Sequence, residues 1–149
     1  MLRGLIKGIQ MIEAFDGETR WLSNFAPCNV VLDGRVYPST ENGYQAAKTT
    51  DLGEREQFQS ITPGKAKKAG KAVTLRPDWN EVKLLVMEDL NRQKYALCDY
   101  REKLLATGDM DIQEGNHWGD TFWGVCNGVG ENHLGKIIMR LRAEIKLAT

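Results

Sequence analysis

The sequence predicts an α+β fold, a single and mostly helical domain with a small antiparallel sheet near its start. Two short β-type runs come early in the chain, and segments with helical signals follow them. Strands and helices do not alternate as they do in a doubly wound α/β fold. We expect the domain to span residues 11–149, with Met1–Gln10 as a loosely attached N-terminal extension that matches no core pattern.

The early sheet is predicted from two segments. Ile12–Phe15 has the composition of a short strand. Residues 29–38, "NVVLDGRVYP", predict a hairpin, because β-branched and aromatic residues flank Asp33 and Gly34. These two residues tolerate the positive φ angles of a type I′ turn.

Two helices are predicted directly after the hairpin. Ser39 can cap a helix that begins "TENGYQAAK". A second, short helix is expected over residues 62–72, with Thr62 as its cap and Pro63 at its first position. Both starts combine a hydroxyl side chain with residues suited to the first turn of a helix.

Two further helices are predicted between residues 79 and 108. Asp78 and Glu81 have the spacing of a capping box before a helix over Trp79–Tyr95. Asp99 and Glu102 repeat that spacing before a shorter helix that ends near 107–108. The expected apolar face of the 79–95 helix consists of Val82, Leu85 and Val86.

The last helix has the clearest pattern. Its apolar residues recur at steps of three and four, which places them in one stripe that should face the core. They are Leu134, Ile137, Ile138, Leu141 and Ile145.

Charge and cysteine content limit the classes of function. The chain has 20 basic and 20 acidic residues, and this balance argues against broad binding to nucleic acid. Cys28, Cys98 and Cys126 are an odd number without CxxC spacing, which favours reduced thiols and a cytoplasmic protein. No apolar run approaches the length of a membrane-spanning helix, so no membrane partner is expected.

A polar helix face is the first candidate for chemistry. Glu41, Tyr44, Gln45 and Lys48 are spaced to lie along one side of the helix after Ser39. They could line a pocket with a carboxylate for acid–base work and an ammonium for phosphate. The pattern alone favours a simpler interpretation, in which Glu41 complements the helix dipole and the other side chains are solvated.

Two loops supply further candidates. In "WLSNF", Ser23 and Asn24 could bind a sugar or a base, or they could satisfy their own backbone in a turn. In the glycine-rich segment 116–135, Trp118 and Trp123 could stack on a flat ring, with Asp120 beside the attached sugar. The alternative is that the tryptophans are core anchors and Asp120 caps the turn after Gly119.

Other chemistry-bearing residues predict no site. His117 and His133 belong to no zinc motif, so no metal is expected. Cys126 has no nearby base in the sequence to activate it. The lysine-rich run "KAKKAGK", residues 65–71, is expected to be a solvated face rather than a phosphate or nucleic-acid site.

These segments occur in an order that resembles the NADAR family, also called YbiA-like or DUF1768. The segments are "FDGETRWLSNFAP", "GRVYPSTENGYQAAK", "RPDWNEVKLLVM", "LLATGD" and "WGDTFWG" followed by "GENHLGKIIMRLR". The resemblance runs from Phe15 to Arg142. It implies an α+β, mostly helical cytosolic protein that hydrolyses N-glycosidic bonds without a cofactor.

The resemblance also implies classes of substrate. Family members cleave the N-ribosidic bond of riboflavin-pathway phosphoribosylamino-pyrimidines or remove ADP-ribose from modified guanine. The expected partner is therefore a small N-riboside or an ADP-ribosylated nucleobase, which could be part of a modified nucleic acid. The family's acidic motif residues fall on Glu41 and Asp120, which become the expected catalytic pair.

The remaining motif positions are expected to bind substrate. They fall on Ser23, Asn24, Tyr44, Gln45, Lys48, Trp118, Trp123 and Asn132. The chain departs from the family at Asn42, where many members have His, and this departure puts in doubt any substrate contact that uses that His.

The predicted mechanism divides acid and base roles between two carboxyls, and the pattern leaves open which residue has which role. Glu41 and Asp120 should then face one pocket, with their carboxyls roughly 5–10 Å apart. Two other classes of function remain open. The chain could be a module that binds ADP-ribose or NAD without cleaving it, or an interaction domain whose lysine run binds an acidic partner.

Overall fold

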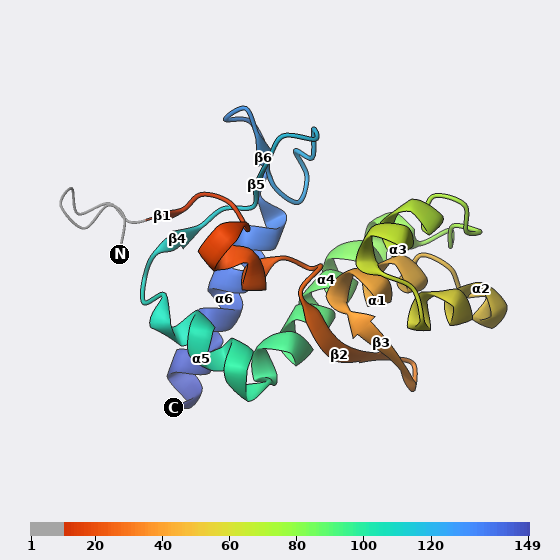
Figure 1. The fold of residues 1–149 in the computed structure, drawn as a ribbon, viewed down its shortest axis with the longest axis horizontal. Helices are drawn as coiled ribbons and strands as arrows, with labels where there is room; N and C mark the ends of the chain where they lie inside the picture. The colour runs from red at the N-terminus through yellow and green to blue at the C-terminus, as the bar shows by residue number, and fades with distance from the viewer. Residues whose placement is uncertain (1–10) are drawn as a thin grey trace. The chain divides into compact units, whose positions relative to one another are not determined.

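The computed structural model describes residues 11–149, so the expectation for Met1–Gln10 lies outside the described part of the chain. The chain divides into two compact units (Figure 1). Unit 1 contains the described part of Met1–Ser23 together with Cys98–Thr149, and unit 2 is Asn24–Leu97. Each unit is described by itself below.

Unit 2 begins with the predicted hairpin. Strand β2 (Pro27–Leu32) pairs antiparallel with β3 (Arg35–Ser39). Asp33 and Gly34 connect the strands with φ angles of 49° and 80°. Both angles are positive, as a type I′ turn requires, so the hairpin prediction is confirmed.

Helix α1 (Thr40–Ala47) follows the hairpin without a loop and packs against both of its strands (Figure 1). Oγ of Ser39 accepts a hydrogen bond of 3.0 Å from the backbone N–H of Asn42, which is the predicted cap. Every residue of α1 is buried. The helix is therefore a central element of unit 2.

Three short helices follow α1 in unit 2. They are α2 (Leu52–Glu56), the 3₁₀ helix η2 (Gln57–Gln59) and α3 (Pro63–Ala69). Thr62 caps α3 as predicted, accepting from the N–H of Lys65 at 3.3 Å. The helix ends at Ala69, earlier than the expected residue 72.

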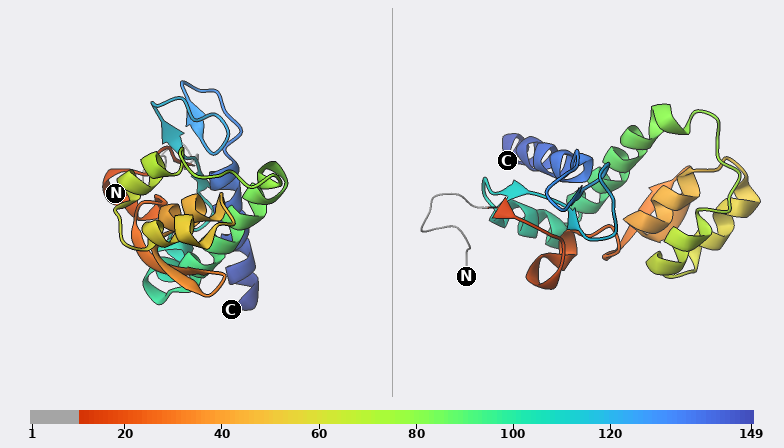
Figure 2. Two further views of the ribbon diagram at one scale, coloured as in Figure 1. Left: turned by 90° about the vertical axis from the view of Figure 1, so that its right-hand side faces the viewer. Right: turned by 90° about the horizontal axis from the view of Figure 1, so that it is seen from above.

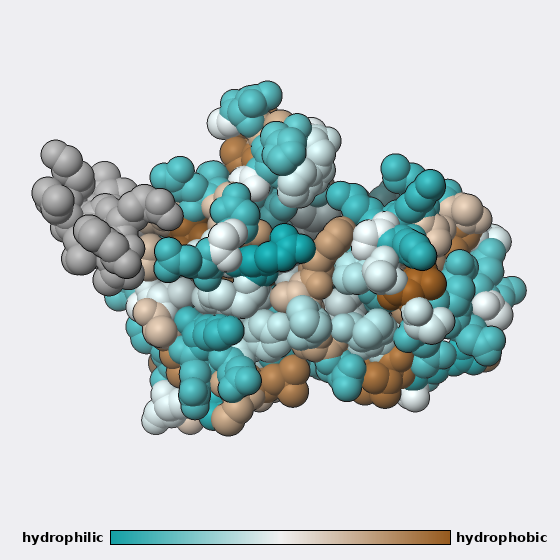
Figure 3. Space-filling model, viewed as in Figure 1, coloured by the Kyte–Doolittle hydropathy of each residue, from teal (hydrophilic) through white to brown (hydrophobic). Residues whose placement is uncertain are grey.

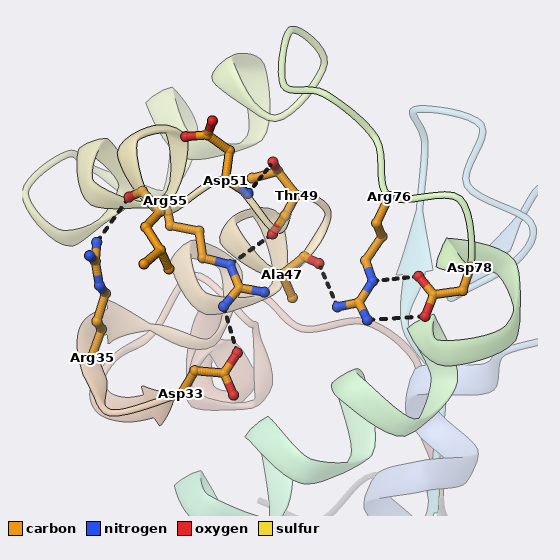
Figure 4. Close-up of polar contacts among 9 residues, drawn as sticks. Asp33, Arg35, Ala47, Thr49, Asp51, Arg55, Arg76 and Asp78 are labelled. Atoms are coloured by element: carbon orange, nitrogen blue, oxygen red, sulfur yellow. Dashed lines mark hydrogen bonds and ion pairs between the residues drawn. The ribbon is translucent and has the colours of Figure 1, made fainter.

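Helix α4 (Trp79–Ala96) has the predicted length but not the predicted cap. The carboxylate of Asp78 instead accepts two hydrogen bonds from the guanidinium of Arg76, at 2.6 and 3.1 Å (Figure 4). Both partners of this bidentate pair are charged, whereas in a cap bond only the carboxylate is, so the pair with Arg76 is the stronger interaction and the capping-box prediction is wrong.

The buried face of α4 also differs from the predicted one. Leu85 is 68% exposed, although the sequence suggested that it faces the core. The buried face includes two polar side chains, which interrupt the apolar pattern and hide the stripe from sequence reasoning. Its residues are Trp79, Met87, Leu90, Asn91, Lys94 and Tyr95.

Hydrophobic surface occurs as separate patches in a mostly hydrophilic surface on the face shown in Figure 3.

A polar network holds α1 within unit 2 (Figure 4). The buried guanidinium of Arg55 donates to Asp33 at 2.6 Å and to the carbonyl of Thr49 at 2.7 Å. At the end of α1, the N–H of Arg76 donates to the carbonyl of Lys48 at 2.7 Å. These hydrogen bonds connect the hairpin tip and the loop before α4 to residues at the end of α1.

Unit 1 contains two short parallel ladders. Strand β1 (Met11–Ile12) pairs with β4 (Asp111–Ile112), and β5 (Gly115–Asn116) pairs with β6 (Val125–Cys126). The predicted strand at Ile12–Phe15 is present only at its first residue. The β1–β4 ladder joins distant parts of the sequence, and local patterns do not predict such pairing.

The other elements of unit 1 are helical. The 3₁₀ helix η1 spans Gly17–Leu22, α5 spans Cys98–Ala106 and α6 spans His133–Ala148 (Figure 2). Asp99 lies inside α5 rather than at its cap, so the second capping-box prediction is also wrong. The apolar stripe of α6 is confirmed, because four of its five members are buried and Ile145 is half-buried. Within residues 11–149, no helix combines the length and the apolar character needed to cross a bilayer.

Candidate active site

The predicted polar face of α1 lies inside unit 2 rather than in solvent. Glu41 is 7% exposed and Gln45 is 4% exposed, while Lys48 is half-buried just after the end of the helix. Nε2 of Gln45 donates a hydrogen bond of 2.6 Å to Oε2 of Glu41. This burial contradicts the interpretation of the face as simply solvated.

Two aromatic rings lie along the same face. The rings of Tyr44 and Trp79 have centroids 5.1 Å apart and are tilted by 57°. Nζ of Lys48 lies 5.7 Å from the centroid of the Tyr44 ring, within the range of a cation–π contact. Sequence reasoning did not place Trp79 at this site, because a tryptophan in the first turn of a helix does not reveal which surface it contacts.

Positive charge gathers around Lys48. Burial lowers the pKa of the Lys48 ammonium from its usual value, and Glu41 opposes that shift. Lys71, Lys67 and Lys83 lower the pKa further, because they place like charges nearby. Two of these lysines belong to the 65–71 run, so the run contributes to this electrostatic environment. All four lysines of the run are exposed, which confirms the prediction of a solvated face.

Asn24, the first residue of unit 2, supports the start of α1. Its carbonyl accepts the N–H of Glu41 at 3.0 Å, and its Nδ2 donates to the sulfur of Met87 at 3.5 Å. The buried Oδ1 of Asn24 has no hydrogen-bond partner within the described residues. Ser23 is the last residue of the first segment of unit 1, where its N–H caps η1 by donating to the carbonyl of Arg20 at 2.9 Å.

Asn42 faces the interior of unit 2. Its Oδ1 accepts the hydroxyl of Ser39 at 2.6 Å, and its Nδ2 donates to the carbonyls of Phe58 and Ile61, both at 2.8 Å. The side chain is fully buried. Asn42 therefore anchors α1 to the 58–61 segment.

Asp120 organises a turn in unit 1. Its Oδ1 accepts the backbone N–H groups of Phe122 and Trp123, at 3.1 and 2.9 Å. The Asn116 side chain braces the same residue, since its Nδ2 donates to the Asp120 carbonyl at 2.9 Å and its Oδ1 accepts the Asp120 N–H at 3.0 Å. Sequence reasoning missed Asn116, although an Asn before a Gly-rich turn is a typical signal for such bonding.

The two tryptophans of this loop have different surroundings. Trp118 is 54% exposed and meets His117 edge-on, with centroids 5.2 Å apart. Trp123 is half-buried in an aromatic cluster, 4.8 Å from Phe122 and 6.4 Å from His133. The exposed ring could stack on a ligand, whereas the inner ring also packs the loop. Across residues 11–149, no group of three or more His, Cys, Asp or Glu residues is placed to hold a metal ion.

Asn132 connects the start of α6 to an adjacent strand. Its Nδ2 donates to the carbonyl of Ile112 at 2.9 Å, and its Oδ1 accepts the N–H of Glu114 at 3.0 Å. Both ends of the amide therefore bind backbone, and its expected contact with substrate stays a prediction. Glu41 lies in unit 2 and Asp120 in unit 1, and the expected separation of their carboxyls likewise stays a prediction.

Comparison with known proteins agrees with this architecture. The model of the NADAR domain matches residues 13–146. The chain is 36% identical over 132 residues to the N-glycosidase Npun_R5314 of Nostoc punctiforme, covering 83% of this chain and 84% of that protein. It is 35% identical over 136 residues to the riboflavin biosynthesis protein VVA0006 of Vibrio vulnificus, covering 85% of this chain but 35% of that longer protein.

A solved structure shares the fold. The NMR structure of the Escherichia coli protein YbiA matches with a TM-score of 0.81 and 30% identity, covering 94% of this chain and 86% of that chain. The fold is therefore α+β and YbiA-like, as the sequence predicted. With the domain match over 13–146, the chain belongs to the NADAR family.

Proposed function

We propose that the protein is an N-glycosidase that hydrolyses the N-ribosidic bond of a phosphorylated riboside. The observation that carries this proposal is the buried carboxylate of Glu41, held by Gln45 on the same helix face as the cationic surroundings of Lys48. Such a face offers a group for C1′ chemistry and a group for phosphate. The name of the Nostoc relative, an N-glycosidase, supports the same class of reaction.

The reaction needs two functions at the ribose. As the C1′–N bond breaks, its electron pair moves to the base nitrogen, and the sugar develops oxocarbenium character. In the proposed mechanism one carboxylate stabilises this cation and takes a proton from the attacking water. The other carboxyl protonates the departing base, so that the products are the free base and the sugar hemiacetal. We assign these two roles to Glu41 and Asp120 as a pair.

The proposed substrate carries phosphate and a flat base. Lys48, with three further lysines in its electrostatic environment, is suited to bind an anionic group through charge-assisted hydrogen bonds. Trp118 or Trp123 would stack on the base, and Ser23 and Asn24 would contact the sugar. Two substrates meet this description, a phosphoribosylamino-pyrimidine and an ADP-ribosylated guanine. The name of the Vibrio relative, a riboflavin biosynthesis protein, favours the first.

The test is single-turnover release of base from both substrates by wild type and Glu41→Gln. Glu41→Gln keeps the size of the side chain and removes its charge, so cleavage should fall roughly 10²–10⁴-fold. Glu56→Gln is the matched control, because Glu56 is exposed on α2, and its cleavage rate should equal that of wild type. Binding of both compounds by wild type without release of base would instead identify a non-catalytic ADP-ribose or NAD module.

A further inference from the structure

The end of α3 lies directly against the side chain of Gln45. A Cβ atom built on Gly70 would overlap Oε1 of Gln45 and would lie 2.7 Å from its Cδ. The same Cβ would lie 3.3 Å from the carbonyl oxygen of Ala66, a tight contact that a small shift would relieve. Any side chain larger than that of glycine at position 70 therefore competes for space with the Gln45 amide.

Backbone conformation does not require glycine at this position. Gly70 has φ −61° and ψ −17°, angles that every L-residue adopts in a right-handed helix. Glycine in such a conformation is normally unfavourable, because it loses more chain entropy on folding than alanine does. The requirement at Gly70 is thus one of space for Gln45.

The amide nitrogen of Gln45 binds Glu41. Nε2 donates to Oε2 of Glu41 at 2.6 Å, while the buried Oε1 has no hydrogen-bond partner within the described residues. Oε1 is the atom that approaches Gly70. The amide is therefore confined between the backbone of Gly70 and the carboxylate of Glu41.

We infer that Gly70 and Gln45 are positioning residues that fix the direction of the Glu41 carboxylate. The inference rests on the proposed function, because it treats Glu41 as a group that acts on the substrate. A carboxylate that must face a developing cation loses effectiveness when it rotates, and displacements of about 1 Å can cost roughly 100-fold in rate. The glycine of the lysine-rich run would thus serve catalysis through Gln45.

The variant Gly70→Ala tests this inference. The group that must move is the far end of a flexible side chain, so the fold should survive while the Gln45 amide leaves Glu41. We expect kcat to fall roughly 10- to 100-fold with KM changed by less than about threefold, because only the direction of a catalytic group changes.

Gly64→Ala is the matched control on the same helix. A Cβ at Gly64 would meet no atom within 4 Å, so this variant should keep wild-type kcat and melting temperature. A second control is a double variant. In a Gln45→Ala background the clashing atoms are absent, so adding Gly70→Ala should cause no further loss of kcat. This pair also tests the inference if Gly70→Ala alone fails to fold.

A spectroscopic measurement tests the contact without relying on activity. The side-chain amide signal of Gln45, identified by its loss in Gln45→Ala, should shift in ¹⁵N-labelled Gly70→Ala and stay unchanged in Gly64→Ala. An unchanged Gln45 signal, unchanged kcat in Gly70→Ala, or an equal further loss when Gly70→Ala is added to Gln45→Ala would overturn the inference. Failure of wild type to cleave any N-riboside would reject the proposed function instead, and the amide signal would still decide whether Gly70 holds Gln45 on Glu41.

Discussion

Oδ1 of Asp120 accepts the backbone N–H of Trp123 at 2.9 Å, three residues further along the chain. The same oxygen accepts the N–H of Phe122, so the carboxylate caps its own turn. This geometry matches the simpler of the two sequence interpretations of Asp120. It is also compatible with catalysis, because backbone bonds to one oxygen fix the orientation of the whole carboxylate.

Two substitutions of Asp120 separate the turn from the chemistry. Asp120→Asn retains a side-chain oxygen at the cap, so its stability should stay close to that of wild type while turnover falls roughly 10²–10⁴-fold. Asp120→Ala removes the acceptor of two hydrogen bonds and should also lose about 1–3 kcal/mol of unfolding free energy. Urea unfolding and single-turnover cleavage measure the two effects. Normal turnover by a well-folded Asp120→Asn protein would leave Asp120 as a turn cap only.

Trp118 and Trp123 should respond differently to substitution by alanine. Trp118 is more than half exposed, so Trp118→Ala should keep the melting temperature and raise KM if the ring stacks on the base. Trp123 packs on Phe122 and His133, so Trp123→Ala should destabilise the protein by roughly 2–4 kcal/mol. Thermal unfolding and steady-state kinetics of both variants test this division. A large loss of stability in Trp118→Ala would contradict it.

Phosphate binding should depend on pH through Lys48. Burial lowers the pKa of Lys48, so its positive charge is lost at a lower pH than that of an exposed lysine. KM for the phosphorylated riboside should therefore rise as pH increases through this lowered pKa. Lys48→Met should raise KM at neutral pH and weaken the pH dependence.

Lys68→Met provides the control for Lys48. Lys68 is exposed on α3 and belongs to the same lysine-rich run. It is not among the groups that shift the pKa of Lys48. Its variant should follow the wild-type KM profile between neutral and alkaline pH, and a profile equal to that of Lys48→Met would indicate a diffuse charge effect.

Lys94 should make stability depend on pH. Burial lowers the pKa of this fully buried ammonium to about 7, and Cys28 opposes the shift. Between this value and the ordinary lysine pKa the unfolded chain binds more protons than the folded one. The free energy of unfolding should therefore rise with pH across that window, by up to about 1.4 kcal/mol per pH unit.

The comparison with Lys94→Met isolates this contribution. Urea unfolding from pH 7 to pH 9 should show wild type gaining stability relative to Lys94→Met as pH rises. Lys103→Met, at an exposed position on α5, should follow the wild-type curve. Parallel curves for wild type and Lys94→Met would show that Lys94 does not titrate in this range.

The sequence alone determined those features that depend on neighbouring residues. The turn at Asp33–Gly34 and the cap at Ser39 were predicted correctly, because each depends on the conformational preferences and hydrogen bonds of a few adjacent residues. The apolar stripe of α6 was predictable for a similar reason, since a helix converts sequence spacing directly into a face. The same rule placed Glu41, Gln45 and Lys48 along one side of a helix.

Only the tertiary structure decided which of these faces are covered and by what. Lys94 is buried, Trp79 lies on Tyr44, and Gly70 leaves room for Gln45. None of these relationships has a local signal, because each joins elements that are far apart in the chain. Spacing fixes where a side chain points on its own helix, but burial and the identity of the opposing surface depend on how the whole unit packs.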